Sequence, residues 1–365
     1  MTGRRSIWPV GDAGVGVIDQ AALPFRYAER TLRSDADIAE AISTMVVRGA
    51  PLIGIAAAYG LALALRADPS DASARAAHAR LLATRPTAVN LGWALDRVAR
   101  TVAPLPPPER AAAAWDVACA MAEEDVAVNR AIGEHGAALI RDVFRRRQRR
   151  VNILTHCNAG RLAAVAHGTA LAAIYRAHAD GVPIHVWVDE TRPRNQGLLT
   201  AWELADAAVS HALVADNAGG VLMQRGDVDL VVVGADRVSG AGDVCNKVGT
   251  YLKALAAFDC GVPFYAAVPS STIDWALVDA QREITIEDRD PEELRVVSGI
   301  LADGRVGAVR LASRETPTAN PAFDVTPARF VSGIVTELGT FAPASLASQR
   351  TRLEPAVGIR RSGNT

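Results

Sequence analysis

Short apolar segments in the second half of the chain predict a parallel β-sheet. The run Leu230–Val233 shows no alternation of polar and apolar positions, as expected of a strand that is covered on both faces. Segments with helical periodicity separate the apolar ones, which is typical of repeated βα units in a Rossmann-like fold. The five predicted strands are VNILTH (151–156), IHVWVDE (184–190), HALVAD (211–216), DLVVVGAD (229–236) and FYAAVP (264–269).

The first half of the chain has the periodicity of helices instead. Ser34 or Asp35 is placed to cap a helix through residues 38–47, and Pro51 suits the first turn of the next helix. The apolar segment Leu52–Leu65 is shorter than the roughly 20 residues that span a bilayer, so we predict a buried helix and no membrane association. Further helices are predicted over residues 75–84, 87–100 and 111–147, and near the other end of the chain over 328–338.

These patterns predict an α/β protein of two domains. A mostly helical N-terminal domain, which opens with short strands and turns, is placed at residues 1–148, and a Rossmann-like catalytic domain with a parallel sheet at residues 149–345. Residues 346–365 are polar and contain Gly, Ser and Arg, so we predict that they form a disordered tail.

Charge and composition exclude several classes of function. Lys and Arg number 39 against 40 Asp and Glu, and a net charge of -1 gives no electrostatic basis for binding nucleic acid or an anionic membrane. The basic run Arg145–Arg150 is interpreted as the solvated end of a helix, with nucleic-acid binding as the alternative. The four cysteines and seven histidines lack metal-ligand spacing, and the N-terminus lacks the apolar core of a signal peptide. We therefore expect no metal site and a cytoplasmic location.

A carboxylate, Asp236, follows the most apolar predicted strand. Ligands of open α/β sheets bind beyond the carboxyl ends of the strands, so Asp236 is a candidate catalytic acid, or else a residue that caps a turn. Asn246 and Lys247 precede a segment with helical periodicity. We expect them to open this helix and so to lie near its N-terminus, where an anion such as phosphate is favoured; a solvated lysine is the alternative.

Two further segments carry candidate chemistry. In RGAP (48–51), an arginine precedes a helix start with free backbone N–H groups, which is either an oxyanion cradle or an ordinary turn. Cys157 follows the first strand of the sheet, and residues 158–160 are expected to open a helix whose N-terminus lowers the thiol pKa; a buried structural cysteine is the alternative. His156 is its neighbour on a strand and points to the opposite face, so a Cys–His pair is disfavoured. Gln196 is placed to bond a sugar hydroxyl or a loop carbonyl.

Taken in order, several motifs resemble those of the S-methyl-5-thioribose-1-phosphate isomerases. This family of methionine-salvage enzymes is related to the regulatory subunits of eukaryotic initiation factor 2B and to ribose-1,5-bisphosphate isomerase. The resemblance covers roughly residues 5–340. The motifs are RGAP (48–51), RPTAVNLGWAL (85–95), ILTHCNAG (153–160), DETRPRNQG (189–197), LTAWEL (199–204), VGADR (233–237), GDVCNKVGTY (242–251), STID (271–274) and NPAFDVTP (320–327).

The resemblance implies a homodimer that converts a furanose aldose 1-phosphate to the open-chain ketose 1-phosphate, with no metal and no redox cofactor. It implies Cys157 and Asp236 as the catalytic pair, with Asp236 as general acid and Cys157 as base or transition-state stabiliser. The implied substrate-binding set is Arg48, Gly49, Ala50, Arg85, Gln196, Asn246 and Lys247.

The chain departs from the family pattern around the expected pocket. QGLLTAWEL (196–204) is one residue shorter than usual and lacks an arginine, DNAGG (216–220) replaces DNMA, and Cys245 replaces a common alanine. 5-Deoxyribose 1-phosphate and ribose 1,5-bisphosphate are therefore alternative substrates to 5-methylthioribose 1-phosphate. A non-catalytic regulatory subunit is the alternative class, although such subunits are expected to lack the catalytic pair. A nicotinamide-dependent dehydrogenase is disfavoured because no G-x-G-x-x-G follows a predicted strand.

Overall fold

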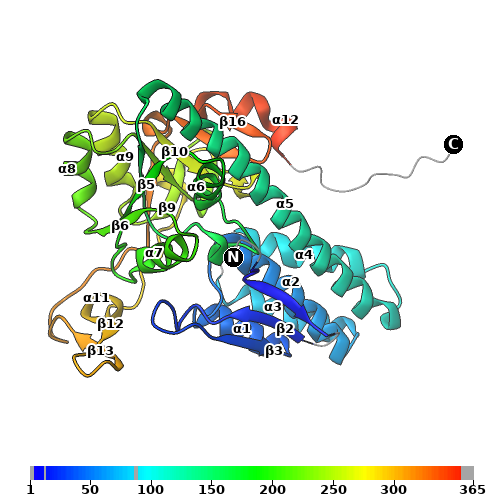
Figure 1. The fold of residues 1–365 in the computed structure, drawn as a ribbon. Coiled ribbons are helices and arrows are strands. Elements are labelled where there is room, and N and C mark those ends of the chain that lie inside the picture. The colour runs from blue at the N-terminus through cyan, green and yellow to red at the C-terminus, as the bar shows by residue number, and fades with distance from the viewer. Residues whose placement is uncertain (1–3, 12–13, 86–88, 355–365) are drawn as a thin grey trace.

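A computed structural model describes residues 4–11, 14–85 and 89–354 of the chain. Figure 1 shows a helical part built from the N-terminal third of the chain beside a part that contains a central sheet. The predicted α/β fold, with helices first and a parallel sheet afterwards, is confirmed. Pro86–Ala88, at the predicted break before the fourth helix, lie outside the described residues.

The helical part begins with a small antiparallel sheet and continues with five helices. Ser34 caps the first helix as predicted, and its hydroxyl accepts a bond from the Asp37 backbone N–H while Asp37 bonds back to the Ser34 N–H. That helix ends at Ser43, four residues before the predicted end. The elements are β1 (Ile7–Val10), β2 (Gly14–Ile18), β3 (Glu29–Leu32), α1 (Asp35–Ser43), α2 (Ala50–Ala67), α3 (Asp71–Leu82), α4 (Val89–Val102) and α5 (Pro107–Arg147).

Helix α2 is the centre of this part. Among the described residues it is the one helix that is long and apolar enough to cross a membrane by length and composition. Every residue from Leu52 to Leu65 is buried against neighbouring helices, so the predicted buried core helix is confirmed.

Helix α5 connects the two parts of the molecule, as Figure 1 shows. Its first half packs in the helical core through Ala114, Ala118 and Met121. Its second half packs against α6 and the sheet through Ile132 and Ile140. Because one continuous helix belongs to both cores, the division of the chain at residue 148 stays a prediction.

The second part is built on a seven-stranded sheet with helices on its faces. The order of the strands in this sheet is β16-β15-β10-β7-β4-β5-β6. All five predicted strands are present in it and are parallel to one another, β15 is parallel to them, and β16 is antiparallel. The strands are β4 (Val151–Thr155), β5 (Ile184–Asp189), β6 (His211–Val214), β7 (Leu230–Val233), β10 (Phe264–Ala267), β15 (Gly333–Thr336) and β16 (Gly339–Phe341). The helices are α6 (Ala170–Ala179), α7 (Gln196–Asp206), α8 (Ala218–Gln224) and α9 (Thr250–Asp259).

Two predictions for the end of the chain are wrong. Residues 328–338 form a 3₁₀ turn (Ala328–Phe330) and then β15, because Gly333–Thr336 pairs with β10 and is buried along its whole length. The predicted tail does not begin at 346, since Leu346 and Leu353 are buried and α12 (Arg350–Leu353) follows a short 3₁₀ turn. Residues 355–365 lie outside the described residues.

Segments after β7 form two smaller sheets near the end of the large one. The first has the order β11-β8-β9-β14, and the second is the β12–β13 hairpin, which projects from the molecule in Figure 1. Asn246 and Lys247 lie at the end of β9, four and three residues before α9. They are therefore near a helix N-terminus as predicted, but they do not open the helix. The elements are β8 (Arg237–Ser239), β9 (Val244–Lys247), β11 (Ile273–Asp274), α10 (Ala280–Glu283), α11 (Glu292–Arg295), β12 (Val296–Ile300), β13 (Val306–Arg310) and β14 (Phe323–Thr326).

Candidate active site

A cleft opens where the strand order of the large sheet reverses. Strand β4 leads to β5 and β6 on one side, whereas the chain returns to place β7 on the other side of β4. Ligands of open α/β sheets bind at such a switch point, beyond the carboxyl ends of the strands. About 840 Å³ in and in front of the cleft, open solvent included, is not filled by protein atoms.

All nine predicted site residues line this cleft, and their roles stay predictions until tested. They come from both parts of the molecule. The helical part supplies Arg48, Gly49, Ala50 and Arg85, and the sheet part supplies Cys157, Gln196, Asp236, Asn246 and Lys247.

Cys157 lies in a turn after β4, and two threonine side chains bond its backbone. Its φ of 67° is in the left-handed region, which a non-glycine residue adopts only when its surroundings enforce it. The Cys157 N–H donates to Thr191 Oγ1 at 2.9 Å, and the Cys157 carbonyl accepts from Thr200 Oγ1 at 2.8 Å. Asp216 in turn holds Thr191, by accepting its N–H at 2.7 Å. The backbone that carries the Cys157 thiol is therefore fixed.

The expected helix after Cys157 is absent, which changes the electrostatics of the thiol. Residues 161–163 form only a 3₁₀ turn, and α6 begins at Ala170. Burial raises the pKa of the Cys157 thiol, against the positive charges of Arg48 and Lys247, which lower it. The predicted depression of the thiol pKa by a helix N-terminus is therefore wrong, and the resting group is a thiol.

Asp236 follows β7 and is held beside β9. Its N–H donates to the Cys245 carbonyl at 2.9 Å, and β8 pairs antiparallel with β9 directly afterwards. Burial raises the pKa of the Asp236 carboxyl, whereas Lys247, Arg85 and Arg48 lower it. The direction agrees with the requirement that a carboxyl stay protonated to act as an acid near neutral pH.

Arg48 is oriented from the sheet part of the molecule. Its guanidinium donates to both the carbonyl and the side-chain oxygen of Asn158. Asn158 itself donates to the buried carboxylate of Glu203 at 2.8 Å and to Thr200 at 3.1 Å. Arg48 Nε is buried and has no partner among the described residues, which leaves a donor for an anionic ligand.

Gly49 and Ala50 form the start of α2 against the other wall of the cleft. Gly49 has a φ of 93°, and a Cβ there would come within 2.4 Å of the Ala163 backbone. A glycine is therefore required both by conformation and by space. Both residues line the cleft at the start of an 18-residue helix, where N–H groups have no partner within the helix, although Pro51 beside them has no N–H to offer.

The remaining members supply a cation and polar atoms. Lys247 is buried, its Nζ lies 4.9 Å from the centre of the Phe323 ring, and burial lowers the pKa of its ammonium group. Arg85 Nε and Gln196 Oε1 are buried without a partner among the described residues, as expected of groups that await a ligand.

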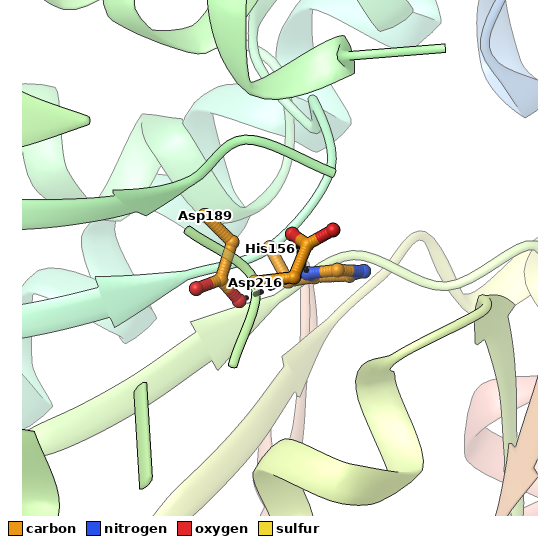
Figure 2. A group of neighbouring side chains, drawn as sticks. All are labelled: His156, Asp189 and Asp216. Carbon is orange, nitrogen blue, oxygen red and sulfur yellow. Dashed lines mark hydrogen bonds and ion pairs between the residues drawn. The ribbon is translucent and has the colours of Figure 1, made fainter. Parts of the chain in front are cut away.

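Three buried or partly buried side chains beside the cleft form a possible ligand set for a metal ion: His156, Asp189 and Asp216 (Figure 2). The ligand atoms have other partners, however. His156 Nδ1 bonds Asp189 at 2.9 Å, and Lys253 Nζ lies 3.3 Å from the same carboxylate oxygen. Both Asp216 oxygens accept backbone N–H groups. Asp189 Oδ1 is buried without a partner among the described residues, but the other carboxylate oxygens of the group already face protein donors, and the Lys253 ammonium beside Asp189 does not favour a cation.

Sequence reasoning missed residues that come from the irregular segment 270–325. Arg289 and Phe323 line the cleft. Arg289 is ion-paired with Glu287 at 2.9 Å and with Glu293 at 2.8 Å. The segment lacks periodicity, but Phe323 lies in NPAFDVTP (320–327), one of the motifs that carry the resemblance, and that signal could have found it. Its position follows from pairing of β14 with β9.

Comparison with known proteins gives consistent results. The family model described as the initiation factor 2 subunit family matches residues 46–343. A methylthioribose-1-phosphate isomerase of Rhodospirillum centenum is 59% identical, over 92% of this chain and 90% of that protein. The crystal structure of 5-methylthioribose 1-phosphate isomerase from Pyrococcus horikoshii OT3 has a TM-score of 0.81 and 38% identity, and covers 96% of this chain and 95% of that one.

A structure titled as the translation initiation factor eIF-2B, subunit delta, from A. fulgidus is also similar. It has a TM-score of 0.78 and 36% identity, over 97% of this chain and 100% of that chain. The fold is thus shared by proteins with different names. Because the family model matches most of the chain and the isomerase relative is similar over nearly its full length, the chain belongs to the initiation factor 2 subunit family, together with the methylthioribose-1-phosphate isomerases.

Proposed function

We propose that this protein isomerises 5-methylthioribose 1-phosphate to 5-methylthioribulose 1-phosphate, in methionine salvage. One observation carries the proposal: a thiol and a carboxyl, Cys157 and Asp236, lie at the ends of adjacent strands in one cleft with four cationic side chains. The regulatory-subunit alternative is not favoured, because the catalytic pair is present and the curated relative is an isomerase.

The phosphate on C1 determines the first step. It keeps the sugar closed, so no free aldehyde is available and an acid must protonate the ring oxygen before the ring opens. Asp236 is the proposed acid, because burial raises its carboxyl pKa and the proton is retained to higher pH than in water. The ring C1–O bond then breaks as the proton arrives.

Hydrogen must next move from C2 to C1, and Cys157 is the proposed partner of that step. In one route Cys157 removes the C2 proton as thiolate and returns it to C1 through an enediol. In the other, hydride moves directly and the neutral thiol stabilises the transition state. In both routes the C2 hydroxyl loses its proton as the C2 carbonyl forms, and the Asp236 carboxylate takes that proton and is restored as the acid. The raised thiol pKa supports the neutral form in the free protein, and the route is decided by the isotope experiment below.

The cations and free N–H groups are proposed to bind the phosphate. Arg48, Arg85 and Lys247 converge on the cleft from both parts of the molecule, and the start of α2 adds backbone donors. Asn246 and Gln196 complete the substrate-binding set. No residue of the proposed mechanism requires a metal or redox cofactor.

The proposal includes a cytoplasmic homodimer. The four cysteines are unpaired, which fits a reducing compartment. Light scattering of the purified protein tests the dimer, and a mass of one chain would contradict it.

The function is tested by proton NMR with 5-methylthioribose 1-phosphate in deuterated water, with 5-deoxyribose 1-phosphate and ribose 1,5-bisphosphate run in parallel. We expect the ketose 1-phosphate, formed fastest from the methylthio sugar. Deuterium at C1 indicates proton transfer through a base, and its absence indicates direct hydride transfer or a shielded proton. Failure of all three sugars with folded protein would support a regulatory subunit instead.

The role of Asp236 is tested by Asp236→Asn. The amide has the same shape and cannot protonate the ring oxygen, so we expect kcat to fall on the order of 10²- to 10⁴-fold. Asp259→Asn, at the exposed end of α9, is the matched control and should keep full activity. Full activity of Asp236→Asn would contradict the assignment.

A further inference from the structure

His156 is a buried residue in the lining of the cleft, and the proposed mechanism does not use it. Its ring is fully enclosed, with 0% of its side chain exposed. Nδ1 lies 2.9 Å from Asp189 Oδ2, and Nε2 lies 2.8 Å from the Val248 carbonyl oxygen. Figure 2 shows the ring between the ends of neighbouring strands, with Asp189 at its Nδ1 side.

The partners of the ring determine its protons. A backbone carbonyl only accepts, so Nε2 carries a proton. Asp189 also contacts the Lys253 ammonium at 3.3 Å, which favours the ionised carboxylate. An ionised carboxylate accepts as well, so Nδ1 carries the second proton and the ring is an imidazolium.

Several charged side chains surround the ring. Asp189 at the end of β5, Asp216 after β6 and Asp324 in β14 are the acidic groups, and Lys253 in α9 is the other cation. Asp324 is engaged by the N–H groups of Gly249 and Tyr251. With the imidazolium, two cations lie among three carboxylates, whereas a neutral ring would leave Lys253 as the one cation among them.

The ring connects the two turns that carry site residues. His156 precedes Cys157 in the turn after β4, and it bonds the carbonyl of Val248, next to Lys247. Gly249 has a φ of 104°, and a Cβ there would meet the His156 ring at 2.9 Å, so this turn is shaped around the ring. A shift of His156 would therefore change the separation of the thiol and the Lys247 ammonium.

We propose that His156 is a positioning residue, a doubly protonated imidazolium that fixes the Cys157 turn against the Lys247 turn through Asp189 and the Val248 carbonyl. The inference rests on the proposed function for its effect on turnover. The two protons on the His156 ring and the fixed position of the Cys157 thiol do not depend on which substrate the protein uses.

The first experiment replaces His156 with glutamine, which keeps one donor and loses the charge. With 5-methylthioribose 1-phosphate we expect kcat to fall on the order of 10²-fold, as a displacement of about 1 Å of reacting groups does, with KM changed much less. Cys157 alkylation by iodoacetamide, followed by peptide mass spectrometry over a pH series, should shift to higher pH because the Lys247 cation moves away. His185→Gln, the same change on the partly exposed end of β5, is the control.

A folded His156→Gln protein with the wild-type kcat and alkylation profile would overturn the proposal. Alkylation is measured without any sugar, so its result does not depend on the proposed function. If the variant does not fold, ¹⁵N NMR of the wild-type chain labelled at histidine takes its place. We expect one histidine ring with two slowly exchanging N–H protons between pH 6 and 8. A neutral His156 in that spectrum would overturn the assignment.

Discussion

At the scale of single residues, the protonation of Asp236 depends on opposing neighbours. Burial raises its carboxyl pKa most, Glu287 raises it further, and Lys247, Arg85 and Arg48 lower it. An acid catalyst is active while it holds its proton, so activity is expected at low pH and is lost as the pH rises through the pKa of Asp236.

Glu287→Gln tests this dependence. The substitution removes a negative charge, and it leaves the Arg289 guanidinium, which Glu287 binds at 2.9 Å, paired with Glu293 alone. Both changes favour the ionised carboxylate, so the pKa of Asp236 falls and the alkaline loss of kcat moves to lower pH. The measurement is kcat against pH at saturating 5-methylthioribose 1-phosphate. Glu283 lines the same cavity as Glu287 and Asp236, so Glu283→Gln is the control. An equal shift of the kcat–pH profile in both variants would contradict the argument.

The types of the site residues were predictable from the sequence, whereas their environments were not. Strand ends located Cys157 and Asp236, because parallel strands present their carboxyl ends at one edge. The thiol pKa was predicted with the wrong sign, since it depends on enclosure by residues distant in sequence, such as Arg48 and Lys247. Arg289 and the bonds of His156 depend on tertiary contacts in the same way.

At the scale of elements, α5 and the segment after the Cys157 turn hold the two parts together. Asp125 in α5 accepts the Val165 N–H at 2.8 Å, and the Val165 carbonyl accepts from the Ser6 N–H at 2.9 Å. Burial raises the pKa of the Asp125 carboxyl to about 7. The contact therefore contains a group that ionises near neutral pH.

Asp125→Asn tests the cost of that ionisation. The folded pKa is above the unfolded value, so the stabilising contribution is complete below the unfolded pKa and is lost as the pH rises through about 7. At pH 8 the asparagine variant should be more stable than the wild type by about 1 to 2 kcal/mol, a value reduced for the partial exposure of the carboxylate. Urea unfolding at pH 8 and pH 4 measures the difference, which should shrink at pH 4.

The control is Asp116→Asn, on an exposed face of the same helix. It should leave the pH dependence of stability unchanged. A wild-type protein whose stability does not fall relative to Asp125→Asn between pH 4 and 8 would show that Asp125 titrates in the normal range.

Elements with strong periodicity were predictable, and those set by pairing were not. Helix α2 and the five parallel strands follow from continuous apolar runs. The segment 328–338 has a similar apolar density and was predicted as a helix. Its β-branched residues Ile334, Val335 and Thr336 instead complete a strand that β10 and β16 enclose.

At the scale of the whole molecule, the cleft is closed only when both parts are in place. The helical part contributes Arg48 and Arg85, and the sheet part contributes Lys247. Without an anion these positive side chains repel one another. A phosphate between them would bond to side chains of both the helical part and the sheet part. An anion that binds only this arrangement therefore stabilises the folded chain by mass action.

This argument predicts that inorganic phosphate raises the melting temperature of the protein without any sugar. At ten times its Kd, phosphate should contribute about 1.4 kcal/mol, which corresponds to a rise of a few degrees. Arg85→Ala removes one cation of the helical part and should reduce the rise, whereas Arg100→Ala, exposed on α4, should not. The measurement is differential scanning calorimetry over a phosphate series at constant ionic strength, with chloride as the reference salt. An equal rise in both variants would mean that phosphate acts elsewhere, and that Arg85 does not join the two parts through the ligand.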